Sequence, residues 1–159
     1  MAKDNKTNAM RKLDSMKISY REHYYTDTDA VNGNEIAQVL GENPEQVFKT
    51  LVTEGKSGAH YVFLVPVCRE LDLKKAAAIA GEKSVSMLKS KELLPLTGYI
   101  HGGCSPIGMK KFFPTTVHIS ALDFDTIFFS GGRIGFQIEM TLADLKKVIP
   151  FSLGDITTD

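Results

Sequence analysis

The sequence predicts a mixed α/β fold built as a single domain. The chain has 159 residues, of which 43% are hydrophobic and 24% charged, and a folded chain of this length buries roughly 68–70% of the surface that its unfolded form exposes. Segments with helical periodicity alternate with strand-like segments, and no internal repeat, linker or low-complexity stretch divides them. We therefore expect residues 1–159 to share one core, with residues 1–6 as a flexible N-terminus.

The first part of the chain predicts two helices separated by a strand, namely helix Thr7–Met16, strand Ser19–Tyr25 and helix Ala30–Leu40. Apolar residues recur every three or four positions in the helices, whereas the strand alternates and is rich in aromatic residues. Thr7 or Asn8 is placed to cap the first helix, and Gly41 to end the second. Pro44 lies in the following turn, where it favours a further short helical turn.

The middle of the chain predicts a hairpin at the centre of a sheet, followed by a helix. The two strand-like runs are Val47–Thr53 and His60–Val67, and a polar, glycine-bearing loop joins them. Helix Asp72–Gly81 comes next, with Asp72 as its N-cap. Ser84–Leu94 has a weaker strand-and-helix pattern. The buried stripe expected for the helix consists of Leu73, Ala76, Ala77, Ile79 and Ala80.

The last third of the chain predicts a long loop, three strands and a closing helix. Between Thr97 and Pro114 the chain is rich in glycine, which indicates loops and strand ends. Gly131 and Gly132 are expected to form a two-residue turn between the last two strands. The expected elements are strands Val117–Ile119, Thr126–Ser130 and Arg133–Glu139 and helix Leu142–Ile149.

The net charge of the chain is zero, with 19 basic and 19 acidic side chains. This balance argues against a protein that holds nucleic acid by bulk electrostatics, because each phosphate contact needs a lysine or an arginine. The charge is uneven, since residues 69–111 carry +4, residues 112–159 carry −3 and residues 1–68 carry −1. The positive segment would suit a polyanionic substrate if it lay beside a pocket, and is otherwise a solvated face.

No segment has the pattern of a secretion signal or a membrane span, because the N-terminus is polar and the longest apolar run, Tyr61–Cys68, is far shorter than the ~20 residues of a membrane helix. Cys68 and Cys104 lack a C-x-x-C spacing, which fits a reducing cytoplasm, and a bridge between them is the alternative. The four histidines have no metal-ligand spacing, and no nucleotide-binding or nucleophile-elbow motif occurs. We therefore expect a cytoplasmic protein without metal or cofactor.

Lys49 is the first candidate for chemistry. The two-residue period of a strand places it on the face of Val47 and Leu51, and the opposite face is also largely apolar. A lysine in such a strand either extends to the edge of the sheet or points into a pocket that uses its charge.

Two glycine-bearing segments are candidates for binding a ligand. His101–Gly108 contains three glycines and a proline, so its backbone could present N–H groups to a carbonyl or an oxyanion. Ser130–Arg133, at a strand end, likewise allows a ligand to approach closely. A tight turn and a hairpin are the respective alternatives. A cysteine paired with a histidine could act as a nucleophile, but Cys68 ends an apolar run and fits a small buried residue better.

Five motifs follow one another along the chain: Val47–Leu51, Leu71–Lys75, Thr97–Tyr99, Gly102–Gly108 followed by Lys110–Lys111, and Ser130–Arg133. In order and spacing they resemble the YbaK/EbsC family of free-standing Cys-tRNA(Pro) deacylases, which is related to the editing domain of bacterial prolyl-tRNA synthetase. The resemblance extends over nearly the whole chain. Cys68 and Cys104 depart from it, because the family usually has a small residue and an aliphatic residue there.

The resemblance implies a mixed sheet curled into a partial barrel and surrounded by helices, with Lys49 as the essential residue of a pocket. It also implies a pocket tyrosine at Tyr25, with Tyr24 as the alternative because the loop before Gly33 differs in length. The remaining implied substrate-binding residues are Gly102, Gly103, Ser105, Pro106, Ser130 and Gly131.

The implied activity is removal of cysteine from mischarged Cys-tRNA(Pro), and also from Cys-tRNA(Cys), at the tRNA 3′ end and in a transient complex with prolyl-tRNA synthetase. As the family is understood, the thiol of the cysteine attacks its own ester carbonyl and releases a cyclic thiolactone and free tRNA. The protein then positions and polarises the ester: Lys49 orients it, and the backbone of Gly102 and Gly103 holds the carbonyl and the terminal ribose.

Two other functions are compatible with the same motifs. A deacylase for alanine or another small amino acid on tRNA(Pro) would use the same lysine and glycine loop. A non-catalytic regulator that binds aminoacyl-tRNA would keep the pocket without the reaction.

Overall fold

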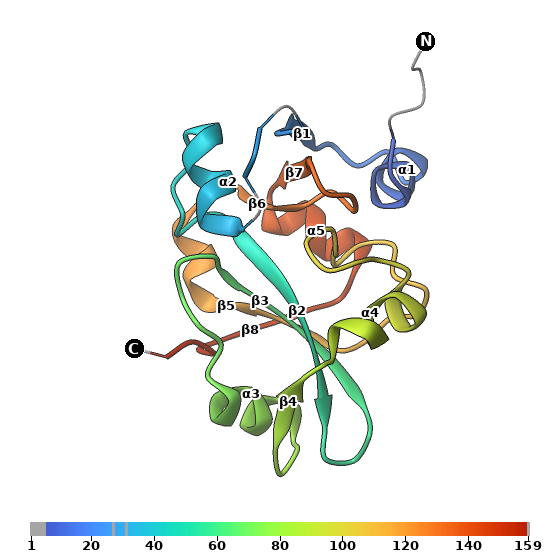
Figure 1. Cartoon of the computed structure of the whole chain (residues 1–159), viewed down its shortest axis with the longest axis vertical. Helices are drawn as coiled ribbons and strands as arrows, with labels where there is room; N and C mark the ends of the chain where they lie inside the picture. Colours follow the sequence, from blue (N-terminus) through green and yellow to red (C-terminus); the bar gives the residue numbers. More distant parts are fainter. Residues whose placement is uncertain (1–5, 27, 31, 159) are drawn as a thin grey trace.

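The structure is a computed structural model that describes residues 6–26, 28–30 and 32–158, and it confirms the mixed α/β fold (Figure 1). The elements, in chain order, are α1 (Asn8–Ser15), β1 (Arg21–Tyr24), α2 (Gly33–Leu40), β2 (Phe48–Gly55), β3 (His60–Pro66), α3 (Leu73–Ala80), β4 (Val85–Met87), α4 (Ser90–Thr97), β5 (Thr115–His118), the 3-10 helix η1 (Ile119–Asp123), β6 (Ile127–Ser130), β7 (Phe136–Met140), α5 (Leu142–Val148) and β8 (Ser152–Gly154).

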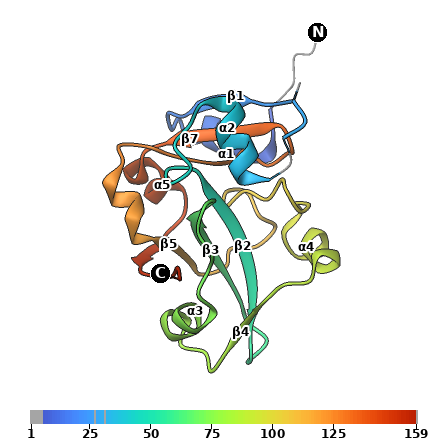
Figure 2. The ribbon, with the colours of Figure 1, turned by 60° about the vertical axis from the view of Figure 1, so that its left-hand side comes forward.

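The strands form two sheets. One has the order β1-β7-β6 and is antiparallel, and the other has the order β4-β2-β3-β5-β8 and is mixed, because β5 pairs in parallel with both β3 and β8. A parallel bridge between Val47 and Phe128 joins the sheets, and the described residues do not close a barrel. Figures 1 and 2 show the three-stranded sheet at one end of the molecule, α3 and β4 at the other, and β2 running between them.

Capping side chains fix the helix ends that the sequence predicts. Thr7 caps α1 by accepting a hydrogen bond from the Met10 N–H at 3.2 Å. Asp72 caps α3 in the same way. Of the N-terminal segment expected to be flexible, residues 1–5 lie outside the described residues. The ammonium of Lys6 lies 3.0 Å from the carboxylate of Asp14.

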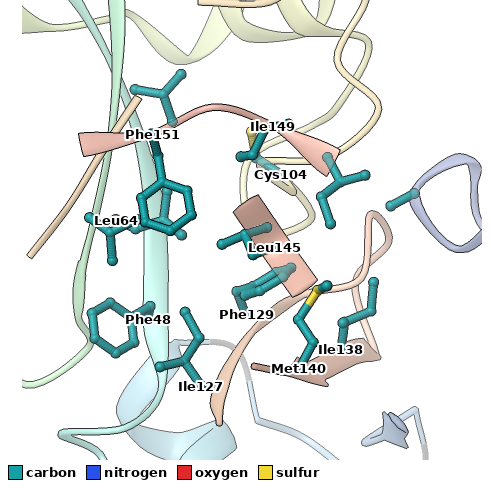
Figure 3. Packing of buried hydrophobic residues seen from close by; sticks show 14 of the residues in the cluster. Phe48, Leu64, Cys104, Ile127, Phe129, Ile138, Met140, Leu145, Ile149 and Phe151 are labelled. Atoms are coloured by element: carbon teal, nitrogen blue, oxygen red, sulfur yellow. The ribbon is translucent and has the colours of Figure 1, made fainter. Parts of the chain in front are cut away.

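The main core fills the space between the two sheets. Figure 3 shows Leu145 of α5 next to Phe129 of the three-stranded sheet, with Phe48 and Leu64 of the five-stranded sheet on the opposite side. Leu64 and Leu145 are completely buried. Burying a side chain of this size stabilises a fold by roughly 1.5–3 kcal/mol. The cluster therefore fixes the two sheets, and the segments packed between them, relative to one another.

The structure corrects the expected buried stripe of α3. Ala76 and Ala77 are buried, but Leu73 and Ile79 are 41% and 43% exposed. The helix lies at the end of the molecule and packs on its sheet through a narrow face of small side chains. The expected helical turn after Pro44 is also wrong, because residues 44–46 form a simple turn.

Three corrections concern the C-terminal part. β7 begins at Phe136 rather than Arg133, because the chain from Gly131 to Gly135 forms a five-residue loop in which Phe136 N–H donates to Arg133 O at 3.0 Å. The strand predicted at Val117–Ile119 is β5, which ends at His118, and Ile119 is instead the first residue of η1. Helix α5 does not close the fold, because strand β8 follows it and pairs with β5.

Candidate functional site

The candidate site follows an edge of β2 that neither sheet covers. Among the described residues, β4 pairs with β2 at Thr53–Gly55, and β6 reaches the beginning of β2 through the Val47 bridge. The Val52 carbonyl accepts a hydrogen bond from Leu88 N–H at 3.0 Å. Backbone N–H and carbonyl groups alternate sides along a strand. The groups of Thr50 therefore point in the same direction as those of Val52, two residues further on. The backbone of β2 is therefore turned toward the gap between β4 and β6.

A cavity of about 310 Å³ occupies this gap. Its walls come from the first half of β2, the start of α2, the β4–α4 segment, the glycine-rich loop after Tyr99, and the ends of β6 and β7. The volume falls at the lower end of the range of roughly 300–1,000 Å³ that small-molecule sites occupy. Three of the five sequence motifs, Val47–Leu51, Gly102–Gly108 and Ser130–Arg133, thus contribute residues to one cavity, whereas Leu71–Lys75 and Thr97–Tyr99 do not line it.

Lys49 lines this cavity from β2. Its side chain is 30% exposed, and its ammonium lies 3.9 Å from the carboxylate of Glu70, which is itself 83% exposed. Such an open ion pair is weak, worth roughly 0–1 kcal/mol. Phe48 and Val52 belong to the main core, whereas Leu51 packs on the cluster under α3, so Lys49 stands on the predicted face of the strand. An incoming anion can compete with Glu70 for its charge.

The glycine-rich loop brings one of its predicted residues to the cavity. Gly102 lines the wall. Gly103 does not, and its N–H donates to Ile100 O at 2.9 Å, so this group is engaged within the loop. Ser105 and Pro106 are buried and do not line the cavity, and the Ser105 hydroxyl accepts a hydrogen bond from Ile107 N–H at 3.2 Å. These residues shape the loop from behind.

The loop between β6 and β7 supports the glycine-rich loop. Ser130 lines the cavity, and its hydroxyl accepts a hydrogen bond from Gly132 N–H at 3.1 Å. Gly131 lies outside the wall, buried, with its N–H bonded to Phe136 O at 2.8 Å. A Cβ added to Gly103 would lie 3.1 Å from the backbone nitrogen of Ile134. The two loops therefore touch backbone to backbone, which requires glycine there.

The structure shows which of the two candidate pocket tyrosines, Tyr25 or Tyr24, lines the cavity. Tyr25 is 4% exposed and lines the cavity, and its N–H donates to Gly135 O at 2.9 Å. Tyr24 is 42% exposed, and its hydroxyl donates to the carboxylate of Glu22. Since neighbouring residues of a strand point to opposite faces, only one of them can reach the cavity.

Two polar residues of the wall did not stand out in the sequence. The Thr50 hydroxyl and the Gln137 side-chain carbonyl are buried, and neither has a hydrogen-bond partner among the described residues. Buried polar atoms without partners are rare in folded proteins and are available to a ligand. In the sequence, each is a polar residue within a largely apolar strand. This pattern also occurs in ordinary sheets, so it did not identify them as site residues.

Cys104 is the thiol that lines the cavity. Burial raises its pKa to about 12, so the thiol is protonated at neutral pH and is a poor nucleophile. Cys68 and Cys104 are both free, Cys68 exposed and Cys104 buried, so the alternative of a disulfide between them is wrong.

The described residues contain no cluster of three or more histidine, cysteine or carboxylate side chains arranged to hold a metal ion. In the same part of the chain, no helix has the length and apolar character needed to cross a bilayer. The side chains that line the cavity include one lysine, the His101 imidazole, the Cys104 thiol, hydroxyl and amide groups, and apolar residues.

A family model described as "Aminoacyl-tRNA editing domain" matches residues 28–148. A protein of Enterococcus faecalis named "Putative Cys-tRNA(Pro)/Cys-tRNA(Cys) deacylase EbsC" is 42% identical over 154 residues, which cover 96% of this chain and 94% of that protein. A proline–tRNA ligase of Thermosipho melanesiensis is 33% identical over 77 residues, which cover 48% of this chain and 14% of the ligase.

Among solved structures, the "Crystal structure of a putative trans-editing enzyme for prolyl tRNA synthetase" aligns with a TM-score of 0.83 and 24% identity, covering 96% of both chains. This likeness confirms the fold. The range matched by the family model includes all five motifs. The chain belongs to the aminoacyl-tRNA editing domain family.

Proposed function

We propose that this chain is a deacylase that removes cysteine from mischarged Cys-tRNA(Pro), and also from Cys-tRNA(Cys). The Enterococcus relative carries this activity in its name and matches over almost its full length. The observation that carries the proposal is the composition of the cavity, which combines Lys49 and the Gly102 backbone with a thiol, Cys104, that is neutral. Such a site can hold an activated ester, and because its own thiol is protonated, a thiol on the substrate is the nucleophile that we propose.

The thiol of the mischarged cysteine supplies that nucleophile. Its sulfur forms a bond to the carbonyl carbon of its own aminoacyl ester, and the bond from that carbon to the ribose oxygen breaks. The thiol proton passes to the ribose oxygen, so free tRNA and a cyclic thiolactone leave, and water later opens the thiolactone. A reaction within one bound molecule gains most from being held in the reactive geometry.

Each cavity residue then has a role in holding the ester. Lys49 orients the ester and the tRNA terminus, and the backbone of Gly102, a residue of the cavity wall, supports the carbonyl oxygen. Tyr25 and Ser130 set the width of the pocket, while Gly103, Ser105, Pro106 and Gly131 keep its two loops together. Thr50 and Gln137 offer acceptors to the amino group of the cysteine, because both keep an unpartnered oxygen in the wall.

A second candidate is a deacylase that removes alanine or another small amino acid with a water molecule. His101 lines the cavity and is exposed, so it could activate water as a general base. Under this alternative, His101→Gln abolishes cleavage. Under the thiol mechanism, the same variant still cleaves Cys-tRNA(Pro), because no base has to act on water in the step that releases tRNA.

The test is deacylation by the purified protein of tRNA(Pro) charged with cysteine, alanine or proline. We expect cysteine to be removed at least about tenfold faster than the other two, a discrimination of about 1.4 kcal/mol. Equal or faster removal of alanine would support the second candidate. No cleavage of any of the three would leave the non-catalytic regulator as the function.

Prolyl-tRNA synthetase is the partner that we propose for this reaction in the cytoplasm, where tRNA is charged. The net charge of zero predicts weak affinity of the isolated chain for tRNA. Adding the synthetase to the assay should therefore raise the rate at low enzyme concentration. Nanomolar binding of tRNA by the isolated chain at physiological salt would contradict the need for this partner.

A further inference from the structure

Three exposed segments border the cavity, and we call them the rim: Met87–Lys91, Ile100–His101 and Arg133–Ile134. Met87, Ser90 and His101 contribute to the cavity wall. The Arg133–Ile134 segment lies against the glycine-rich loop, because a Cβ added to Gly102 would lie 3.6 Å from the end of the Ile134 side chain. The rim is therefore continuous with the site.

The rim carries positive charge that is not neutralised locally. Lys89, Lys91 and Arg133 are exposed, and within the described ranges none of them forms an ion pair with a carboxylate. The Arg133 guanidinium lies 4.7 Å from the centre of the Phe136 ring, and Phe136 lines the cavity. This contact holds a cation at the margin of the site. Glu92 follows Lys91 directly and adds one negative charge beside the rim. The three cations outweigh it, so the rim keeps a net positive charge.

Large apolar side chains stand among these cations. Met87 is 46% exposed, and Ile100 and Ile134 are each 50% exposed. Alternation of cations with exposed apolar surface suits an unpaired nucleic acid strand, because its phosphates need positive charge and the faces of its bases need apolar partners. A second cleft, on another part of the surface, is lined by Asp123, Asp125 and Asp144, and such a surface repels phosphates.

We propose that the rim binds the unpaired 3′ end of the tRNA, with Lys89 and Arg133 on its phosphates and Met87 and Ile134 against its bases. The identity of the RNA rests on the proposed function, whereas the preference for a single strand rests on the rim itself. The rim holds the strand while the terminal ester enters the cavity beside Lys49. Phosphate contacts position a strand without reading its sequence, so the rim accepts tRNAs of different acceptor sequence.

The direct test is binding of an uncharged, fluorescently labelled single-stranded RNA heptamer ending in CCA, followed by anisotropy. Four variants are compared with the wild type: Lys89→Ala, Arg133→Ala, the double variant, and Lys12→Ala as a control on the exposed face of α1. We expect the double variant to bind at least about tenfold more weakly, and its salt slope to fall by about 1.4, or about 0.7 for each lost phosphate contact. The control should bind as the wild type does.

Two further measurements keep the result decisive. Arg133→Lys keeps the charge and should recover most of the affinity, which a loss caused by misfolding would not do. Wild-type affinity in the double variant, an equal loss in Lys12→Ala, or equally tight binding of a duplex RNA of the same length would each overturn the proposal.

Deacylation of Cys-tRNA(Pro) separates this proposal from the proposed function. The double variant should raise KM about tenfold while kcat changes much less, because the rim holds the RNA and does not touch the ester. Binding of the heptamer through the rim without any deacylation by the wild type would leave the rim in place and overturn the function. Conversely, the wild type could deacylate Cys-tRNA(Pro) while the double variant keeps the wild-type KM and heptamer affinity. That result would leave the function in place and overturn the rim proposal.

Discussion

The side-chain amide of Gln137 donates a hydrogen bond to Oε1 of Glu42 at 2.9 Å, and this contact ties the cavity wall to the residue that follows the C-cap of α2. Gln137 is 3% exposed. Because its nitrogen is turned toward Glu42, its carbonyl oxygen is the group left for a donor on the substrate. Burial raises the pKa of Glu42, and the hydrogen bond from Gln137 and the nearby His23 offset part of this rise.

Replacing Glu42 by glutamine should stabilise the folded protein more at pH 7 than at pH 4. A raised pKa means that the folded state binds the proton of Glu42 more tightly than the unfolded state does. The stability linked to Glu42 is then fully present below its ordinary pKa of 4.5 and is lost as the pH rises through the raised value. Glutamine does not titrate, so Glu42→Gln avoids this loss.

The measurement is the free energy of unfolding in urea for the wild type and Glu42→Gln at both pH values. The two proteins share every other titrating group, so their difference isolates Glu42. A difference that is the same at pH 4 and pH 7 would show that Glu42 has no raised pKa in the folded state.

Lys49→Ala should lower kcat/KM for Cys-tRNA(Pro) at least about 100-fold, the size of effect expected when one group that stabilises a transition state is removed. Its stability should change little, because Lys49 is partly exposed and its contact with Glu70 at 3.9 Å is weak. Lys56→Ala, at the exposed tip of the same hairpin, serves as the control. Activity of Lys49→Ala within a few-fold of the wild type would remove Lys49 from the mechanism.

The sequence predicts what depends on local periodicity. The β2–β3 hairpin, the face on which Lys49 stands and the Asp72 cap of α3 all follow from residue spacing within one segment, and the structure has each of them. The resemblance adds Tyr25, Gly102 and Ser130, which the structure brings to one cavity.

What the sequence does not predict depends on contacts between distant segments. Strand β8 has three residues and exists because β5 offers it a parallel edge. Leu73 and Ile79 have the spacing of a buried stripe, but the position of α3 at the end of the molecule leaves them exposed. Thr50 and Gln137 acquire a possible role only because the gap between the sheets leaves their oxygens without partners.

Gly135→Ala should destabilise the protein more than Gly58→Ala does. Both glycines have φ of 95°, so each substitution incurs the same left-handed backbone cost of roughly 1–2 kcal/mol. A Cβ at Gly135 would also lie 2.5 Å from the Thr26 side chain, whereas a Cβ at Gly58 meets nothing within 4 Å. Urea unfolding of the two variants measures the difference. Equal destabilisation would show that the β6–β7 loop can move away from Thr26.

The two cysteines should react differently with a thiol reagent. Cys68 is exposed, while Cys104 is 7% exposed and burial raises its pKa to about 12. Partial burial and a hydrogen bond to the Glu45 carboxylate raise the pKa of the Cys68 thiol, so we expect one equivalent of Ellman's reagent to react with the native protein at Cys68, more slowly than with a free thiol, and a second to react only after denaturation. Fast reaction of both thiols in the native protein would show that the cavity wall around Cys104 opens.

In the proposed reaction the substrate supplies its own nucleophile, and a comparison of two charged tRNAs checks this. Single-turnover deacylation is measured with tRNA(Pro) charged with cysteine and with 2-aminobutyrate, which has a similar size and no thiol. Attack by the substrate thiol predicts fast release of cysteine and a rate for 2-aminobutyrate at least about 100-fold lower, since the effective molarity of an oriented intramolecular group is lost. Equal rates for the two amino acids would contradict it.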